Sequence, residues 1–171
     1  MISFPERQKD AERLHCAGFL TEFGITSEDA VTVMDEADKY LQSWLGWDYK
    51  PYAGITGAGN SIWYDNGTMN MEVAAILSRT YAPSVAGVVQ QMEYSHTTNH
   101  FTLVYYLTKM CTANTTEIYL NEALHYKNGY TVAIQPEGVA VWTSPRTNHI
   151  EVIHNAGLPE RTGIQVTITP K

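Results

Sequence analysis

The 171-residue sequence has little cysteine, few basic residues and no long apolar run. Its two cysteines, Cys16 and Cys111, fit neither a zinc-binding spacing nor a disulfide framework, and we predict that both are buried free thiols. Eleven Lys and Arg face eighteen Asp and Glu, for a formal net charge of -7, which argues against a nucleic-acid partner. No stretch reaches the roughly 18 consecutive apolar residues that a membrane helix needs.

Other absences concern chemistry and targeting. The sequence contains no phosphate-binding loop, no nucleophile elbow and no zinc motif, so we expect no cofactor and no metal. The first ten residues, MISFPERQKD, lack the apolar region of a signal peptide. Two N-glycosylation motifs begin at Asn66 and Asn114, and they predict glycosylation in the secretory pathway. That route would need a signal peptide outside this sequence.

The first part of the sequence alternates between helical and strand patterns. Residues 5–14 predict a short helix, and the apolar run that ends at Glu22 predicts a buried strand. The three- and four-residue apolar spacing that follows predicts a helix up to the strand at 43–49, and residues 69–79 predict another helix. This alternation is typical of βα units with a parallel sheet. Two parallel strands alone cannot bury both of their faces, as parallel sheets almost always do. Residues 1–87 therefore indicate the end of a larger α/β fold.

Beyond residue 87 the pattern changes to short β-branched and aromatic segments separated by turn residues. Seven such segments are VVQQMEY, FTLVYYL, TEIYL, YTVAI, VAVWT, IEVIH and GIQVTIT. Short strands at this spacing indicate an antiparallel β-sandwich, which we assign to residues 88–171.

A small set of residues could carry chemistry. Glu22 stands where a predicted strand ends, and the carboxyl edge of a parallel sheet is where α/β barrels place their active sites. The alternative is a solvated strand-end carboxylate or an ion-pair partner. Trp44 and Trp47, on the next strand, have opposite side-chain parity, so only one of them faces the barrel interior. A tryptophan there can stack on a sugar, with Lys50 as a polar companion.

Four motifs then resemble one family along essentially the whole chain: RLHCAGFLTEFG, SWLGWDYKPY, LSRTYAPSVAG and TEIYLNEALHYKNGY. They resemble the endoglycoceramidase-like branch of glycoside hydrolase family 5. The resemblance implies the C-terminal part of a (β/α)8 TIM barrel, strands seven and eight, followed by a β-sandwich. It also implies that Glu22 is the nucleophile and that Trp47 lies beside the sugar at the scissile bond, with Trp44 and Lys50 as further substrate contacts. Gly46 departs from the pattern, because an aromatic residue is expected there.

The implied activity is retaining hydrolysis of glycolipids such as glycosylceramides. The resemblance implies that it takes place outside the cell or in the lysosome, and that the enzyme contacts a membrane only through its lipid substrate. Such chemistry needs two carboxyl groups about 5–5.5 Å apart. The family's acid/base residue lies on strand four, and nothing before Glu22 supplies it. The pair Asn121-Glu122 looks similar but lies in the all-β part, and we interpret it as structural. We therefore expect a C-terminal fragment that is inactive alone and whose exposed barrel faces favour self-association.

Two questions stay open from the sequence. A non-catalytic reading makes the sandwich a glycan-binding, glycolipid-binding or interaction module and Glu22 a relic. Within the enzymatic reading, glucosylceramide, longer glycosphingolipids and steryl glucosides are all compatible substrates.

Overall fold

The computed structural model describes residues 3–26, 29–51 and 61–171. The chain divides into two compact units, Met1–Leu77 (unit 1) and Ser78–Lys171 (unit 2). The division falls ten residues before the boundary placed at residue 87, because the segment from Ser78 onward already belongs to the β-rich unit. In the described parts of the chain, no helix is long and apolar enough to cross a bilayer.

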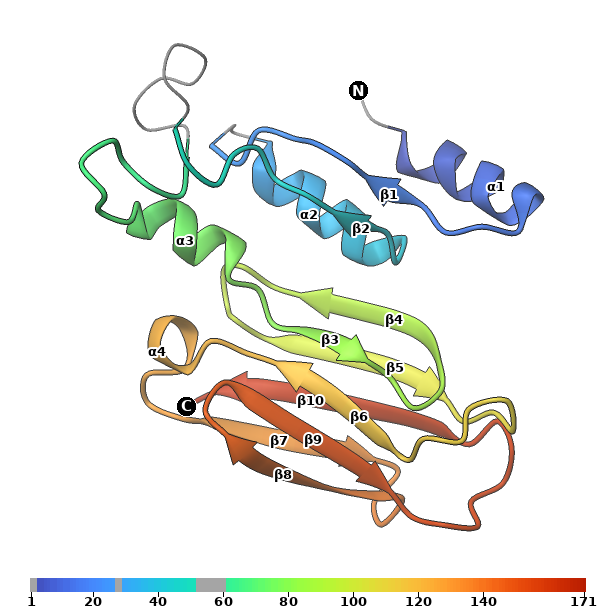
Figure 1. Cartoon of the computed structure of the whole chain (residues 1–171). Coiled ribbons are helices and arrows are strands. Elements are labelled where there is room, and N and C mark those ends of the chain that lie inside the picture. Colours follow the sequence, from blue (N-terminus) through green and yellow to red (C-terminus); the bar gives the residue numbers. More distant parts are fainter. Residues whose placement is uncertain (1–2, 27–28, 52–60) are drawn as a thin grey trace. The chain divides into compact units, whose positions relative to one another are not determined.

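Unit 1 alternates helices with two short parallel strands (Figure 1). Its elements are α1 (Phe4–Leu14), β1 (Phe19–Leu20), α2 (Ala30–Lys39), β2 (Ser43–Trp44) and α3 (Met71–Leu77). The predicted alternation is therefore present, but α2 stops before the end expected from its apolar stripe. Leu41 adopts a positive φ of 52° there, which ends helical geometry and turns the chain into β2.

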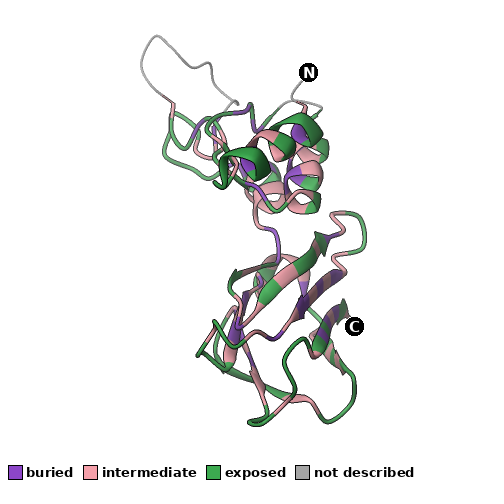
Figure 2. Cartoon of the chain, turned by 90° about the vertical axis from the view of Figure 1, so that its right-hand side faces the viewer, coloured by how far each residue is buried: buried purple, intermediate pink, exposed green. Residues whose placement is uncertain are grey.

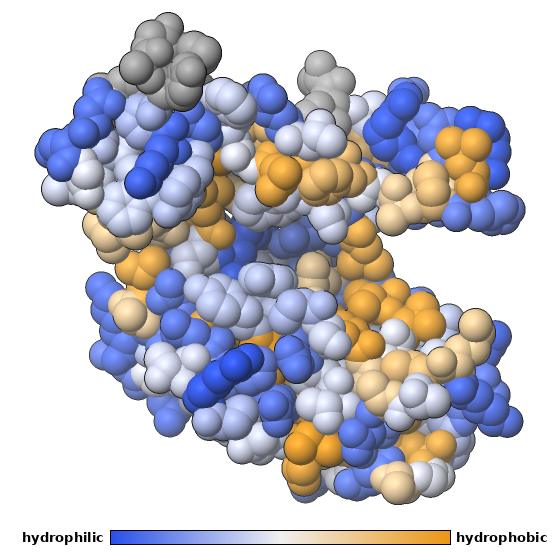
Figure 3. All heavy atoms as spheres, in the orientation of Figure 1, coloured by the Kyte–Doolittle hydropathy of each residue, from blue (hydrophilic) through white to orange (hydrophobic). Residues whose placement is uncertain are grey.

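The core of unit 1 lies between the two strands and the helices α2 and α3. Its buried members are Phe23, Ile25, Ala30, Met34 and Val73. Leu20 and Trp44 pack against this cluster, whereas their neighbours Phe19 and Leu45 are 54% and 57% exposed. Because successive side chains of a strand point to opposite faces, one face of the β1–β2 pair is covered by helices and the other is open and apolar. Figure 3 shows apolar side chains at the surface near β2.

Unit 2 is a β-sandwich of two four-stranded antiparallel sheets (Figure 1). One sheet has the order β4-β5-β10-β7 and the other the order β3-β6-β9-β8. The bounds are β3 (Tyr81–Ser84), β4 (Val88–Tyr94), β5 (Phe101–Tyr106), β6 (Thr115–Tyr119), α4 (Glu122–His125), β7 (Tyr130–Gln135), β8 (Ala140–Arg146), β9 (His149–His154) and β10 (Gly163–Pro170). All seven expected strands are present, which confirms the sandwich.

Besides the short helix α4, the strand β3 is an element that the sequence reasoning missed. Its Pro83 argues against a central strand, since proline cannot donate to a ladder. β3 lies at the edge of its sheet, where that defect is tolerated, and it pairs with β6 through Tyr81 and Tyr119.

The sandwich core follows the alternation of the strand sequences, as the banded strands in Figure 2 show. In β5, Phe101, Leu103 and Tyr105 are completely buried, and the residues between them are half-buried. Ile164, Val166 and Ile168 of β10 do the same from the paired strand. These side chains meet Ile118, Ile150 and Val152 of the facing sheet in one continuous cluster.

The prediction that both cysteine thiols are buried is wrong. Both cysteines are free, but Cys16 is exposed just after α1, and Cys111 is half-buried in the β5–β6 loop. Each stands in a connection rather than in an element, so its side chain is not enclosed by packed layers.

The buried phenol of Tyr126 predicts alkaline sensitivity. Tyr126 is 3% exposed, donates to the Asn99 carbonyl at 2.9 Å and bonds the Thr80 hydroxyl at 2.8 Å. Burial raises the pKa of Tyr126 from 10.0 to about 12. The folded state therefore keeps a proton that the unfolded state loses above pH 10, and stability falls as the pH rises from 10 to 12.

We expect Tyr126→Phe to be less stable than wild type at pH 7 by about 1 kcal/mol, through the lost hydrogen bonds, and to lose less stability between pH 10 and 12. Urea unfolding of both proteins across this range measures the difference. Parallel pH profiles would contradict the assignment.

Candidate active site

The strand that carries Glu22 pairs with the strand that carries Trp47 beyond the ends of β1 and β2. Leu45 N donates to Leu20 O at 2.9 Å, and Trp47 N donates to Phe23 O at 2.7 Å. Ile25 N closes the series by donating to Trp47 O at 3.2 Å. Since the strands are parallel, Glu22 and Trp47 lie at the same carboxyl edge, as the sequence predicted.

The pairing contains one extra residue on the Glu22 side. Leu20 lies opposite Trp44, and Gly24 lies opposite Trp47, so four steps on one strand match three on the other. This extra residue indicates a β-bulge within residues 21–23, the segment that contains Glu22. Bulges bend a strand and re-aim its side chains, and here the bulge falls on the candidate nucleophile.

Glu22 is exposed, while the next residue, Phe23, is buried. The ring of Phe23 contacts Trp44 edge to face, with centroids 5.4 Å apart. Within the described parts of the chain, Glu22 makes no hydrogen bond and no ion pair, so the ion-pair alternative finds no partner there. The bulge thus anchors its backbone through Phe23 and leaves the carboxylate accessible.

The two tryptophans have different environments, as their opposite parity predicted. Trp44 is half-buried and packs with the core of unit 1. Trp47 is 48% exposed and has the more accessible indole. The peptide bond between Trp47 and Asp48 is cis.

Lys50 and two aromatic residues, Tyr49 and Trp63, form a group of contacting side chains. The Lys50 ammonium lies 5.9 Å from the ring centroids of both Tyr49 and Trp63. The two rings meet edge to face at 6.3 Å. The sequence also makes the loop GITGAGNSIWY a candidate wall of an apolar channel beside the site. This loop contains Trp63, and its residues 54–60 lie outside the described residues. The ring contacts add Tyr49 and Trp63 to Lys50, a grouping that spacing along the chain does not reveal.

Three polar side chains in and after the Trp47 segment are buried: Asp48, Ser61 and Asn70. Ser61 Oγ donates to the Asp48 carboxylate. From the sequence, Asp48 could be read only as a polar companion of Trp47, because its partner Ser61 is 13 residues away.

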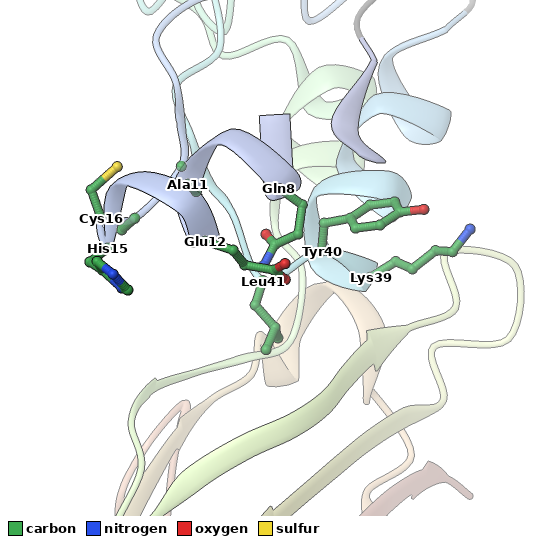
Figure 4. Close-up of a pocket in the computed structure, with 10 residues that line it drawn as sticks. Gln8, Ala11, Glu12, His15, Cys16, Lys39, Tyr40 and Leu41 are labelled. Carbon is green, nitrogen blue, oxygen red and sulfur yellow. The ribbon is translucent and has the colours of Figure 1, made fainter. Parts of the chain in front are cut away.

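A pocket, shown in Figure 4, lies against the segments that lead into β1 and β2. It measures about 520 Å³ and is lined by α1, by residues 15–18 and by Lys39, Tyr40 and Leu41. These segments precede β1 and β2, so the pocket is at the amino ends of the strands. Ligands of parallel α/β sheets bind outside the carboxyl ends, and this pocket is therefore separate from the candidate site.

The Asn121-Glu122 pair is structural, as interpreted from the sequence. Asn121 caps α4 by accepting from Leu124 N at 3.1 Å. The Glu122 carboxylate accepts from Asn148 N at 3.2 Å, and Asn148 Oδ1 accepts from Glu122 N at 2.9 Å. This reciprocal clamp joins α4 to the β8–β9 turn. Among the described residues, no cluster of three His, Cys, Asp or Glu could hold a metal ion.

Packing explains why a glycine, and not the expected aromatic residue, stands at position 46. A Cβ at this position would lie 2.2 Å from Cγ2 of Ile25, which is 1% exposed, and 3.8 Å from the Phe23 ring. The space that an aromatic side chain would need is therefore filled by the core of unit 1.

We expect Gly46→Ala to destabilise unit 1 by about 1–3 kcal/mol through overpacking. Calorimetric or urea unfolding measures the loss. Gly163→Ala is the matched control, because a Cβ there meets nothing within 4 Å. Equal stability of the two variants would contradict the packing account.

The fold and the strand edge together define a sandwich joined in sequence to a βα unit with an accessible carboxylate. Residues 79–168 match the model of the glycoside hydrolase family 5 C-terminal domain. The chain belongs to this family, and the resemblance drawn from its four motifs is confirmed.

Two curated relatives are named endoglycoceramidase. That of Hydra vulgaris is 38% identical over 139 residues, covering 79% of this chain and 27% of the relative. That of Cyanea nozakii is 30% identical over 180 residues, covering 99% of this chain and 36% of the relative. The chain thus spans about a quarter to a third of the length of these relatives.

Solved structures of sterylglucosidase 1 from Cryptococcus neoformans share the fold. One has a TM-score of 0.69 at 13% identity and covers 90% of this chain and 29% of its own. Another has a TM-score of 0.68 at 12% identity and covers 98% and 32%. At this identity the likeness concerns the fold alone.

Proposed function

We propose that this chain supplies the nucleophile-bearing end of a retaining glycosidase of the endoglycosylceramidase type, which acts on glycolipids such as glycosylceramides. The observation that carries the proposal is the exposed, bulged Glu22 on the strand paired with Trp47. Membership of glycoside hydrolase family 5 and the names of the two relatives support it.

In this reaction a Glu22 carboxylate oxygen attacks the anomeric carbon and forms a glycosyl-enzyme. The bond to the ceramide oxygen breaks, and an acid protonates that oxygen as it leaves. The same group then takes a proton from water, which attacks the anomeric carbon and releases the sugar and Glu22. Glu22 suits the first role because its oxygens are exposed and engaged by no described residue.

Neighbouring side chains would hold the sugar. The exposed indole of Trp47 offers an apolar face to the ring of the sugar nearest the scissile bond. Trp44 fixes the strand from the core side through its contact with Phe23. The ammonium of Lys50, held over Tyr49 and Trp63, can donate to sugar hydroxyls.

We further propose that the acid/base carboxyl group comes from a part of the enzyme outside these 171 residues. Two carboxylates that could be mistaken for it have other partners, since Asp48 is bonded to Ser61 and Glu122 to Asn148. In this proposal β1 and β2 are strands seven and eight of a (β/α)8 barrel, whose remaining strands cover the open face at Phe19 and Leu45. The isolated chain would then be inactive and prone to self-association through that face.

The test joins this chain to the upstream part of the Hydra vulgaris relative and measures hydrolysis of a fluorescent glucosylceramide. Glu22→Gln should lower kcat on the order of 10³-fold or more, because the amide cannot act as a nucleophile. Glu12→Gln, the same chemical change on α1, is the matched control and should leave kcat unchanged.

Chemical rescue adds a mechanistic arm. Glu22→Gly with azide should release a glycosyl azide of inverted configuration, because azide occupies the place of the missing carboxylate. Near-normal turnover by Glu22→Gln would refute the nucleophile assignment.

We also propose that the enzyme passes through the secretory pathway and carries a glycan at Asn66. Asn66 is exposed on a turn between Tyr64 and Thr68, and its side-chain oxygen accepts from Thr68 N at 3.0 Å and from Thr68 Oγ1 at 2.6 Å. Asn114 is exposed too, but its motif ends at Thr116, which is completely buried and accepts from Ala86 N at 3.0 Å. Asn114 could then be modified only before the sandwich folds.

Expression behind a signal peptide in animal cells, followed by peptide mass spectrometry, should find Asn66 more fully occupied than Asn114. Asn66→Gln should remove most of the mobility shift that glycosidase treatment produces, and Asn114→Gln should remove less. The reverse ranking would overturn this prediction.

A further inference from the structure

Trp47 combines an exposed side chain with a fixed backbone. Its N–H donates to Phe23 O at 2.7 Å, and its carbonyl accepts from Ile25 N at 3.2 Å. Both bonds go to the strand that carries Glu22, one on each side of Gly24. The backbone of Trp47 is thus set relative to Glu22, but these bonds do not by themselves fix the direction of its indole.

The next residue is tied in the other direction. Asp48 is 8% exposed, and its carboxylate accepts from the hydroxyl of the completely buried Ser61. Its main-chain oxygen accepts from Ile62 N at 3.2 Å. The side chain and the backbone of Asp48 therefore bind two consecutive residues, Ser61 and Ile62, in the segment that precedes α3.

That loop is anchored to α3 in turn. Ile62 O accepts from the N–H of Asn70, a residue that is 6% exposed, at 2.7 Å. Asn70 Oδ1 accepts from Val73 N at 3.3 Å in the first turn of the helix. A series of hydrogen bonds, which we call the Asp48 latch, thus links Asp48 to Ser61 and Ile62, Ile62 to Asn70, and Asn70 to α3.

A latch of this kind has a cost. Burying a carboxylate is unfavourable unless hydrogen bonds compensate, and well-packed apolar residues often serve stability as well or better. A satisfied buried polar network does fix one arrangement of the groups it joins. In the sequence, Asp48 stands between Trp47 and the Tyr49-Lys50 pair, and Ser61 and Ile62 directly precede Trp63, so release of the Asp48 latch would free the backbone next to each of them.

We propose that Asp48 is a positioning residue for the reaction: its buried carboxylate, held by Ser61, orients Trp47 toward the sugar bound beside Glu22. This inference rests on the proposed glycosidase function. It deepens that function by assigning a role to a carboxylate that does not touch the substrate. A displacement of about 1 Å at a substrate-positioning group can cost on the order of 10²-fold in rate.

The test uses the completed enzyme described for Glu22. Asp48→Ala should lower kcat/KM by about 10- to 100-fold, because the acceptor for Ser61 Oγ is lost. Asp48→Asn keeps an acceptor oxygen in the same place and should restore most of that loss. Ser61→Ala should follow Asp48→Ala in direction with a smaller effect.

A double-mutant cycle separates positioning from stability. If Asp48 acts through Trp47, adding Asp48→Ala to Trp47→Ala should change kcat/KM less than threefold further. Gln42→Ala is the control: Gln42 is 7% exposed at the other end of β2, so its loss should lower the unfolding midpoint without coupling to Trp47.

The outcomes distinguish the two proposals. Loss of activity in Glu22→Gln, together with multiplicative effects of Asp48→Ala and Trp47→Ala, would overturn the latch and leave the glycosidase function standing. Normal turnover by Glu22→Gln would overturn the function itself. If Asp48→Ala does not fold, the latch is judged on Asp48→Asn and Ser61→Ala, and equal kcat/KM of Ser61→Ala and wild type would overturn it.

Discussion

The parallel backbone pairing between the Glu22 strand and the Trp47 strand is the constraint on which the candidate site depends. Three backbone hydrogen bonds extend this pairing past the ends of β1 and β2. They accommodate one extra residue at Glu22 and set the opposing residues around it. Without this register, the carboxylate and the exposed indole would be two separate surface features. With this register, the carboxylate and the indole lie at the carboxyl edge of the strands, where parallel α/β folds place their active sites.

The interior of unit 1 explains why the edge can be rigid while its side chains stay accessible. Phe23 and Trp44 pack on the core side of the strands, and Gly46 leaves room for the side chain of Ile25. The apolar contacts thus hold the backbone from one side only. The Asp48 latch holds the following loop by polar contacts, which are directional and therefore specify orientation more sharply than packing does.

The strands of the sandwich and the alternation of helices and strands in unit 1 could be predicted, because both depend on patterns within a few consecutive residues. Short β-branched and aromatic segments between turn residues predicted seven of the eight sandwich strands, and the clamp at Glu122 agrees with its structural interpretation. The features that were missed have non-local causes. Pro83 disguised β3, whose edge position is visible only in the assembled sheet. The thiols of Cys16 and Cys111 were expected to be buried from residue type alone, but their connections leave them at least partly accessible.

The sequence by itself determined the class of each unit and placed Glu22 at a strand end, because hydrophobic period and turn residues act over a few positions. The tertiary structure decided the bulge at Glu22, the choice of Trp47 over Trp44 as the exposed indole, and the bond from Ser61 to Asp48. The physical reason is that register and burial arise from contacts between segments far apart in the chain. Thirteen residues separate Asp48 from its partner, and no local pattern records that distance in space.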